Sequence, residues 1–398
     1  MTDAPAAADV AAAAERMAAF LDRTGVGSPR PPRRYLWTDA FAVCNLLELQ
    51  RLTGDARWGE SAVALVEQVH RVLGRHRDDD PRQGWISGLA EEEGRERPTA
   101  GGLRIGKELP ERGQREAPHP RLEWDRDGQY FHYLTRWMHA LARLAAATGD
   151  ARYHRWAVEL AVVAQDRFTH RSGDQPPRMA WKMSIALDRP QVPSMGHHDP
   201  LDGWVTALAL LAASPPGSQP ALERAAAALA EIAARTRWAT DDALGLGGLL
   251  ADAWRVAQLE ARGAVADATL LPHLLDEARR SFAAFSAESL RLPADHRLPF
   301  RELGLAIGLQ ALGRLVRWSA EPPAASPALR SRVAALERWW PLAAEIVAVW
   351  RDPANQTGPT WRDHLDINEV MLATSLVPDG YLTVGTPGAV TGSSPPGG

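Results

Sequence analysis

Cysteine is almost absent from this chain of 398 residues, in which Cys44 is the single thiol. One thiol forms neither an internal disulfide nor a multi-cysteine zinc site, which argues against a disulfide-stabilised scaffold and favours a reducing compartment. The alanine-rich N-terminus also lacks the cationic segment and uninterrupted apolar run of a signal peptide, because Asp3, Asp9 and Glu15 interrupt it. We therefore expect a cytoplasmic protein.

A long apolar segment and an excess of basic residues are missing as well. No window approaches the roughly 20 apolar residues that a membrane-spanning helix requires. The formal net charge is -4 and the pI is about 6.3, so the chain has no overall basic field to attract nucleic acid. With 45% hydrophobic and 24% charged residues, the composition excludes wholesale disorder and indicates a soluble globular protein.

Apolar residues recur at helical spacing along almost the whole chain, whereas alternating strand patterns are rare. The turn Thr-Gly-Asp-Ala-Arg, followed by an aromatic residue, occurs twice, at 53–58 and 148–153. In such a turn, glycine supplies the left-handed residue that ends one helix, and aspartate caps the next helix. This internal repeat predicts helical hairpins whose apolar faces cover one another.

Extending the hairpin pattern gives two alternating classes of helix. Polar, aromatic-rich loops precede six inner helices, expected to start near Asp39, Gly128, Pro200, Gly247, Arg301 and Ile367. Six amphipathic outer helices are expected near 8–23, 55–73, 150–168, 220–236, 270–288 and 328–350. This alternation predicts an all-α (α/α)6 toroid, a closed ring in which the loops before the inner helices gather at one rim. An open helical solenoid is the alternative, since it uses similar hairpins without polar and aromatic residues in one class of loop.

The predicted domain organisation is a single toroid over residues 1–384. Within it, the segment 75–123 is long, weakly periodic and rich in Gly, Arg and Glu, and we interpret it as a rim or lid insertion. The segment 385–398 is rich in Gly, Pro, Ser and Thr, which predicts a disordered tail.

Carboxyl groups and aromatic rings are densest at the start of the second inner helix, in 123–133. A carboxyl group beside tryptophan favours its neutral form and one beside arginine stays ionised, so Asp125 and Asp127 are candidates for an acid–base pair. Glu302, with its apolar neighbours, and Asp366, before the last inner helix, complete the four candidate catalytic carboxylates. Helix N-capping and solvated helix starts are the structural alternatives.

The other rim loops supply candidate binding residues. Adjacent His197 and His198, with Asp199 or Asp202 to orient an imidazole, predict a proton-transfer or sugar-hydroxyl site. No zinc-protease or cysteine-bearing spacing accompanies them, so we expect no metal. The remaining residues predicted to contact a substrate are Trp37, Asp39, Arg104, Lys107, Tyr130, His132, Trp181, Arg301, Trp361 and His364.

One segment imitates a phosphate-binding loop. Residues 101–107 carry glycine and lysine at the required positions, but Glu108 replaces the serine or threonine and would repel phosphate. No convincing strand precedes the segment either. We therefore expect neither a nucleotide nor another cofactor.

The whole pattern resembles the six-hairpin glycosidase-like superfamily, whose members share the (α/α)6 toroid. The resemblance is architectural and covers about residues 8–384. It is carried by the alternating helices and by loops with Trp37-Thr38-Asp39, Glu123-Trp124-Asp125-Arg126-Asp127, His197-His198-Asp199 and Trp361-Arg362-Asp363-His364. The superfamily includes glycoside hydrolases, polysaccharide lyases and sugar epimerases or isomerases. The resemblance implies a carbohydrate-active enzyme that hydrolyses a glycosidic bond with a carboxylic acid and a carboxylate.

Two alternatives remain open at this point. A sugar epimerase or isomerase on the same ring would use His197 or His198 with Glu302 to move a proton at a sugar carbon. A sugar-binding or scaffold protein without catalytic activity would use its carboxylates as helix caps. In each case the expected ligand is a sugar or an oligosaccharide, and neither nucleic acid nor a membrane is an expected partner.

Overall fold

The computed structural model describes residues 5–117, 119–171, 173, 176–192, 194–265, 267–321 and 325–385. Apart from Gly385, the predicted tail lies outside these ranges. Within them, no helix is both long enough and apolar enough to cross a membrane.

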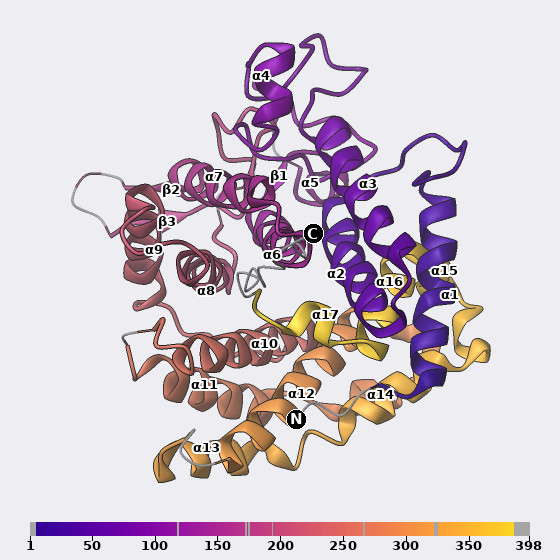
Figure 1. The fold of residues 1–398 in the computed structure, drawn as a ribbon, viewed down its shortest axis with the longest axis vertical. Coiled ribbons are helices and arrows are strands. Elements are labelled where there is room, and N and C mark those ends of the chain that lie inside the picture. Colours follow the sequence, from indigo (N-terminus) through magenta and orange to yellow (C-terminus); the bar gives the residue numbers. More distant parts are fainter. Residues whose placement is uncertain are drawn as a thin grey trace, which may run out of the picture.

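Helices in two concentric layers make up the fold (Figure 1). The inner layer consists of α2 (Leu36–Thr53), α6 (Phe131–Thr148), α8 (Asp199–Ala212), α10 (Ala243–Glu260), α12 (Pro299–Ala320) and α16 (Leu365–Leu376). The outer layer consists of α1 (Ala7–Arg23), α3 (Ala56–Leu73), α7 (Ala151–Phe168), α9 (Pro220–Ala233), α11 (Leu270–Ala284), α13 (Pro327–Glu337) and α14 (Leu342–Arg351). The predicted alternation of inner and outer helices is confirmed. The predicted first residue of an inner helix differs most from the observed one in α10, which was expected to begin at Gly247 and begins at Ala243.

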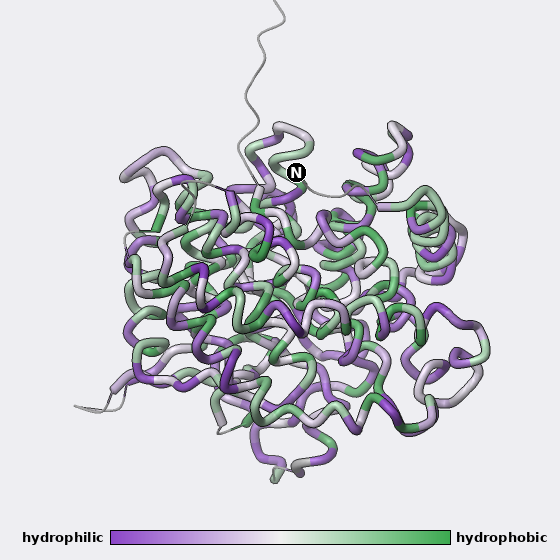
Figure 2. The backbone as a smooth tube through the Cα atoms, turned by 90° about the horizontal axis from the view of Figure 1, so that it is seen from below, coloured by the Kyte–Doolittle hydropathy of each residue, from purple (hydrophilic) through white to green (hydrophobic). Residues whose placement is uncertain are grey.

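The ring closes because its last inner helix packs against its first. Inner helices contact their neighbours in the order α2, α6, α8, α10, α12 and α16, and α16 returns to α2. The short helix α17 (Asp379–Leu382) packs against both α2 and α10, inside the ring. Apolar side chains fill the space between the layers, and Figure 2 shows hydrophobic residues along the packed helices and hydrophilic ones along the outer loops. A closed ring excludes the open solenoid.

The repeated turns fold as their sequence predicts. Gly54 and Gly149 each have a φ of 71°, in the left-handed region that glycine occupies without strain. Asp55 and Asp150 then cap the next helix, because each side chain accepts a hydrogen bond from the backbone N–H two residues later, at 3.0 and 2.8 Å. Each turn reverses the chain from an inner to an outer helix.

Glycine also sets the width of the ring interior. Gly247 of α10 lies against the backbone of α12, and a Cβ at this position would overlap the carbonyl oxygen of Gly304. A Cβ at Gly308 would overlap the carbonyl oxygen of Gly247 in turn. The two inner helices therefore approach backbone to backbone, which narrows the ring on this side.

The sixth outer helix differs from the prediction. One helix was expected over 328–350, but the chain forms α13 and α14 with a break at 338–341. Pro341 stands immediately before α14, and proline lacks the N–H and the space that a continuous helix requires. The helical periodicity on both sides of the proline conceals this break.

Short elements connect the long helices. Strand β1 (Gln129–Tyr130) pairs antiparallel with β4 (Lys182–Met183), and Gln129 lies opposite Met183. Strands β2 (Thr169–His170) and β3 (Arg178–Met179) form a second antiparallel pair. The remaining elements are α4 (Glu91–Glu96), α5 (Pro120–Asp125), α15 (Pro359–Arg362), and the 3-10 helices η1 (Ala287–Arg291), η2 (Ala294–His296) and η3 (Pro353–Gln356).

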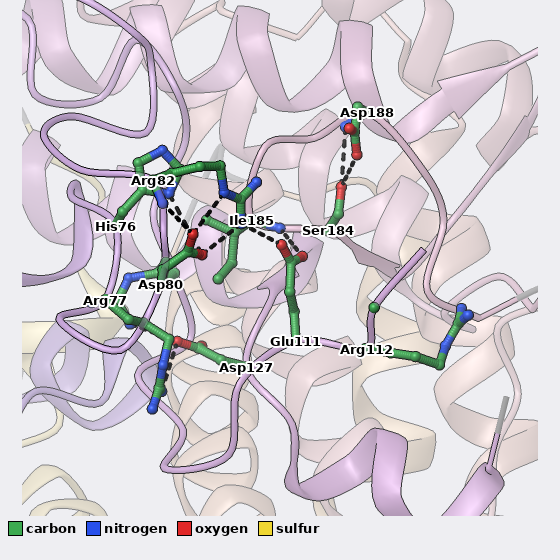
Figure 3. Close-up of polar contacts among 12 residues, drawn as sticks. His76, Arg77, Asp80, Arg82, Glu111, Arg112, Asp127, Ser184, Ile185 and Asp188 are labelled. Carbon is green, nitrogen blue, oxygen red and sulfur yellow. Dashed lines mark hydrogen bonds and ion pairs between the residues drawn. The ribbon is translucent and has the colours of Figure 1, made fainter. Parts of the chain in front are cut away.

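The insertion over 75–123 is tied to the loop that follows β4 (Figure 3). Arg82 bridges Asp80 and Glu111, with both nitrogen–oxygen distances 2.7 Å. Glu111 also accepts a hydrogen bond from the backbone N–H of Ile185 at 2.7 Å. These contacts fix the insertion as a wall beside β4, at the end of the ring where α6 begins.

Candidate functional site

The starts of the inner helices contact one another round one end of the ring. Trp37 of α2 lies beside His132 of α6, with 6.0 Å between ring centroids, and Nδ1 of His132 lies 3.6 Å from Oδ1 of Asp199 in α8. Three further contacts continue this belt, namely Arg301 with Asp242, Phe300 with His364, and Arg33 with Asp366. The loops before the inner helices therefore form one rim, as predicted.

Asp199, the first residue of α8, is a buried carboxyl group with an unused oxygen. Its side chain is 7% exposed, and Oδ2 has no hydrogen-bond partner among the described residues. The backbone of Gly196 packs so closely over the carboxyl that a Cβ there would overlap it. Burial, together with the negative charge of Asp202, raises the pKa of Asp199 to about 8. The carboxyl is therefore mainly protonated at neutral pH and is able to donate a proton.

Asp202 lies one turn further along α8 and has the opposite protonation state. Burial alone would raise its pKa, but the positive charges of Arg136 and Arg255 hold the pKa below its usual value. Its carboxylate pairs with Arg136 and accepts a hydrogen bond from the hydroxyl of Thr135. One turn of α8 thus presents a neutral carboxyl group and an ionised carboxylate.

His132 supplies a neutral imidazole beside Asp199. Burial lowers the pKa of His132 to about 4, and the charge of Arg136 acts in the same direction. The imidazole stacks on the ring of Tyr130, with 5.5 Å between centroids. At neutral pH, a proton donor and a proton acceptor therefore lie side by side.

A run of aromatic rings leads from solvent to this pair. Trp124 is 57% exposed and lies 4.8 Å from Trp181, which stacks on Tyr130 at 5.0 Å between centroids. Tyr130 continues to His132 and then to Trp37. We call these five residues the aromatic ladder. The faces of sugar rings stack on aromatic side chains, and Trp124 and Trp181 are the tryptophans of the ladder that keep exposed surface for such contacts.

A cavity of about 40 Å³ lies inside the ring, next to the inner end of the ladder. Trp37, Arg136, Gly248 and Tyr381 are among its lining residues. Nε1 of Trp37 and Nε of Arg136 are buried and find no hydrogen-bond partner in the part of the chain that the structure describes. Buried donors are normally paired, so these two are available to an oxygen-rich ligand.

Comparison with known proteins identifies the architecture but no family. No family model and no curated protein sequence matches the chain. Among solved structures, the chain is similar to the alpha-1,6-mannanase GH76A of Salegentibacter sp. HEL1_6. An inactive variant in complex with alpha-1,6-mannotriose has a TM-score of 0.52 and 13% identity, with 93% of this chain and 99% of that chain covered. A second structure of this mannanase has a TM-score of 0.50 and 14% identity, with 92% of this chain and 98% of that chain covered.

A D-mannose isomerase has the same architecture, with a TM-score of 0.50, 12% identity, and 94% of this chain and 98% of that chain covered. This protein is an (α/α)6 toroid. At these identities the likeness establishes the fold alone, and it confirms the (α/α)6 toroid predicted from the alternating helices.

The toroid brings together several of the residues that the sequence singles out. Trp37, Tyr130, His132, Trp181 and Asp199 converge on the rim beside the cavity. Lys107 belongs to the same neighbourhood, since its Nζ lies 5.9 Å from the centroid of the Tyr130 ring.

Two of the predicted catalytic carboxylates lie just before the second inner helix, and the charge of each acts on Tyr130. Asp125 is exposed. Asp127 is fully buried and pairs with Arg104 at 2.6 Å, and it also accepts a hydrogen bond from the backbone N–H of Gly106 at 3.0 Å. Arg104 therefore binds a carboxylate of its own chain, and both residues anchor the insertion to the ring.

The other two predicted carboxylates turn toward outer elements. Glu302 is bound by Arg297 at 2.6 Å and by the indole N–H of Trp350 in α14 at 2.7 Å. Asp366 pairs with Arg23 of α1 and with Arg33, both at 3.0 Å. The catalytic role of these four carboxylates stays a prediction. Asp127, Glu302 and Asp366 are held in ion pairs, whereas Asp199 keeps an unpaired oxygen.

The remaining predicted residues are distributed around the rim. Asp39 caps α2, because Oδ2 accepts a hydrogen bond from the backbone N–H of Tyr35 at 3.0 Å. His198 contacts the carbonyl oxygen of Trp238 through Nε2 at 2.7 Å. Trp361 is buried, and Arg301 is partly exposed and forms an ion pair with Asp242. His197 and His364 are exposed. Within the described ranges, no three or more His, Cys, Asp or Glu side chains form a group that could hold a metal ion.

Sequence reasoning missed Arg136 and Tyr381, and it considered Asp202 only as an alternative to Asp199 for orienting an imidazole. Arg136 follows His132 by four residues and Asp202 follows Asp199 by three, spacings that place each pair on one helix face. That signal was available. Tyr381 gives no comparable signal, because it reaches the ring interior through α17, outside the predicted hairpins.

Proposed function

We propose that this toroid is a carbohydrate-active enzyme whose substrate stacks along the aromatic ladder and meets Asp199 at its inner end. The observation that carries the proposal is a buried carboxyl group with an unpaired oxygen at the end of a series of stacking rings, and burial raises the pKa of this group to about 8. The similar solved toroids, a mannanase and a mannose isomerase, also favour a sugar substrate by analogy of fold.

The reaction that we propose first is hydrolysis of a glycosidic bond. Asp199 donates its proton to the glycosidic oxygen as the bond between this oxygen and the sugar carbon breaks. Water then adds its hydroxyl to the sugar carbon, and its remaining proton returns to the Asp199 carboxylate. Asp202 stays ionised because it forms an ion pair with Arg136. Its negative charge disfavours a second carboxylate nearby and so favours the protonated form of Asp199. The length of the ladder, which reaches exposed Trp124, favours an oligosaccharide.

Sugar isomerisation is the second candidate, and one observation favours it. His132 and Asp199 are only 3.6 Å apart, an arrangement that suits proton exchange at neighbouring atoms of one sugar. His132 would take a proton from a sugar carbon while Asp199 donates one to the carbonyl oxygen beside it. The two reactions place the same carboxyl in the same role of proton donor.

A panel of oligosaccharides and free sugars incubated in D₂O separates these possibilities. Release of new reducing ends without deuterium on carbon supports hydrolysis, and deuterium on carbon of a free sugar supports isomerisation. Tight binding without turnover of any member would identify a sugar-binding protein and contradict the enzymatic proposal. Asp199→Asn serves as the matched control, since any turnover that it retains does not come from this site.

The pH dependence of the reaction follows from the protonation state of Asp199. Its pKa is raised to about 8, so the active, protonated form is present below this value and disappears above it. We expect kcat/KM, which reports the protonation state of the free enzyme, to fall by about tenfold per pH unit above pH 8. Initial rates between pH 6 and pH 10 measure this, on protein shown to remain folded. A rate that climbs steadily from pH 7 to pH 9 would require a different proton donor.

Trp124 should govern the length of substrate that binds. Since Trp124 is 57% exposed at the outer end of the ladder, Trp124→Ala removes a stacking surface without opening the core. We expect KM for a tri- or tetrasaccharide to rise by about five- to tenfold, as for the loss of one aromatic contact, and KM for a simple aryl glycoside to stay unchanged. Leu122→Ala, also in α5 and 38% exposed, is the control. Equal effects of both variants on all substrates would argue against the ladder.

A further inference from the structure

A second and larger cavity, of about 310 Å³, lies away from the rim. Its lining comes from the second halves of α6 and α8, from the first residues of α7, and from Arg255 and Val384. The small cavity is lined by residues of α2, α6, α10, α12, α16 and α17, and no described residue lines both cavities. The large cavity is therefore separate from the site proposed above.

Tyr381 lines the small cavity and also contacts a residue of the large one. The centroid of its ring lies 4.9 Å from Cζ of Arg255, which lines the large cavity, and 5.9 Å from Cζ of Arg136, which lines the small one. Its carbonyl oxygen contacts Nε2 of His139 at 2.8 Å. This tyrosine is 4% exposed, so its ring is buried among these contacts.

The walls of the large cavity are mainly apolar. Alanine side chains of α6 face leucine and alanine side chains of α8, and these small residues leave the space between the two helices unfilled; the wall residues include Ala142, Ala145, Ala146, Ala209 and Leu210. A cavity of about 300 Å³ lies at the lower end of the volumes that are typical of small-molecule sites. Its apolar walls suit the apolar part of a ligand.

The inner end of the cavity is polar and carries positive charge. Arg255 is 2% exposed, and its Nε and Nη2 lack hydrogen-bond partners among the residues that the structure describes. The side chain of Thr206 is 4% exposed, and its hydroxyl likewise has no hydrogen-bond partner among the described residues. Two carboxylates that do not line the cavity lie near Arg255. Its Nη1 is 3.5 Å from Oδ1 of Asp252 and 3.7 Å from Oδ1 of Asp202.

Arg136 and Arg255 balance two carboxylates, and the additional positive charge of Arg143, which also acts on His139, makes the surroundings favour an anionic ligand. Asp202 is shared with Arg136, so two guanidinium groups face Asp202 and Asp252. The described lining contains no carboxylate, and the imidazoles of His139 and His154 complete its polar part. Near the cavity, Arg262 donates a hydrogen bond to the carbonyl oxygen of Val384 at 3.2 Å. The electrostatic environment thus disfavours a cation and leaves guanidinium donors for an acceptor.

We infer that this cavity is a second small-molecule site, which binds an amphipathic carboxylate with its apolar body between α6 and α8 and its carboxylate toward Arg255. The apolar walls provide the hydrophobic contact, and the unpaired nitrogens of Arg255 provide charge-assisted hydrogen bonds. The inference does not depend on the reaction catalysed at the rim.

Isothermal titration calorimetry with three probes of one apolar body tests both parts of the inference. The probes are 4-phenylbutyrate, 4-phenylbutanol and 4-phenylbutylammonium, which differ only in their polar end. We expect 4-phenylbutyrate to bind at least tenfold more tightly than the alcohol and the ammonium compound to bind most weakly. Equal binding of all three probes, or no binding of 4-phenylbutyrate, would overturn the inference.

Variants locate the binding and distinguish other occupants. Ala209→Phe fills the cavity and should abolish binding, whereas Ala283→Leu, on the exposed face of α11, should leave it unchanged. Thr206→Val keeps the shape, removes the hydroxyl, and should weaken 4-phenylbutyrate more than 4-phenylbutanol. The chain shortened after Gly385 should bind as the full chain does. Much tighter binding by the shortened chain would instead make residues 386–398 the occupant and contradict a small-molecule site.

Discussion

Asp199→Asn is expected to lower kcat by about 10³-fold or more while leaving substrate affinity within a few-fold of the original. Asparagine keeps the size and the hydrogen-bonding capacity of the side chain but cannot supply a proton, and a positioned general acid contributes roughly 10²–10⁴-fold. Steady-state kinetics and equilibrium binding of the same oligosaccharide measure the two quantities. A variant that retains more than a tenth of the rate would remove Asp199 from the mechanism.

The same variant has a stability signature that separates chemistry from misfolding. The pKa of Asp199 is raised to about 8 in the folded state, so the folded protein binds more protons than the unfolded chain between about pH 4 and pH 8. Its free energy of unfolding therefore falls as the pH rises through this window. Asp199→Asn should flatten that decline without abolishing it, because the pKa of Asp252 is raised to about 7 and acts with the same sign. Urea denaturation at pH 5, 7 and 8.5 measures the slopes.

Arg136→Met is expected to lower the free energy of unfolding by about 3–5 kcal/mol, since it removes a partner from a buried carboxylate. Arg136 is buried in the ring interior and binds Asp202, which keeps only Thr135 and the more distant Arg255 in the variant. Urea denaturation at pH 7 measures the change. The effect should be larger at pH 8 than at pH 5, because the deprotonated Asp202 is the form left without its partner.

The double variant Arg136→Met/Asp202→Asn should recover a large part of that loss, because no unpaired charge then remains buried. Arg57→Met is the surface control: Arg57 pairs with Asp55, but its side chain is 86% exposed, and we expect no measurable change. If the buried and exposed variants lose equal stability, the Arg136–Asp202 pair does not hold the ring interior together.

Most of the fold could be predicted from the sequence because its signals are local. The Thr-Gly-Asp turns encode their own caps, and each amphipathic helix shows its apolar face within a few turns. The closed ring follows from counting hairpins, which needs no knowledge of long-range contacts. The break at Pro341 and the position of α17 escaped prediction, since the first is masked by helical periodicity on both sides and the second depends on contacts between distant segments.

The site was less predictable, because a carboxylate that is free and one that is bound look alike in sequence. Glu302 has the apolar neighbours expected of a general acid, yet Arg297 lies within reach only after the chain folds. Asp127 is likewise neutralised by Arg104 from the insertion. Asp199 was correctly placed among the rim residues, but its unpaired oxygen is visible only in three dimensions.

A crystal structure of the Asp199→Asn protein soaked with a mixture of oligosaccharides tests the central claim most directly. The account predicts electron density for sugar units stacked along Trp124, Trp181 and Tyr130, with a glycosidic oxygen or a sugar hydroxyl within hydrogen-bond distance of residue 199. Density for sugar on another surface, with the rim empty, would contradict it.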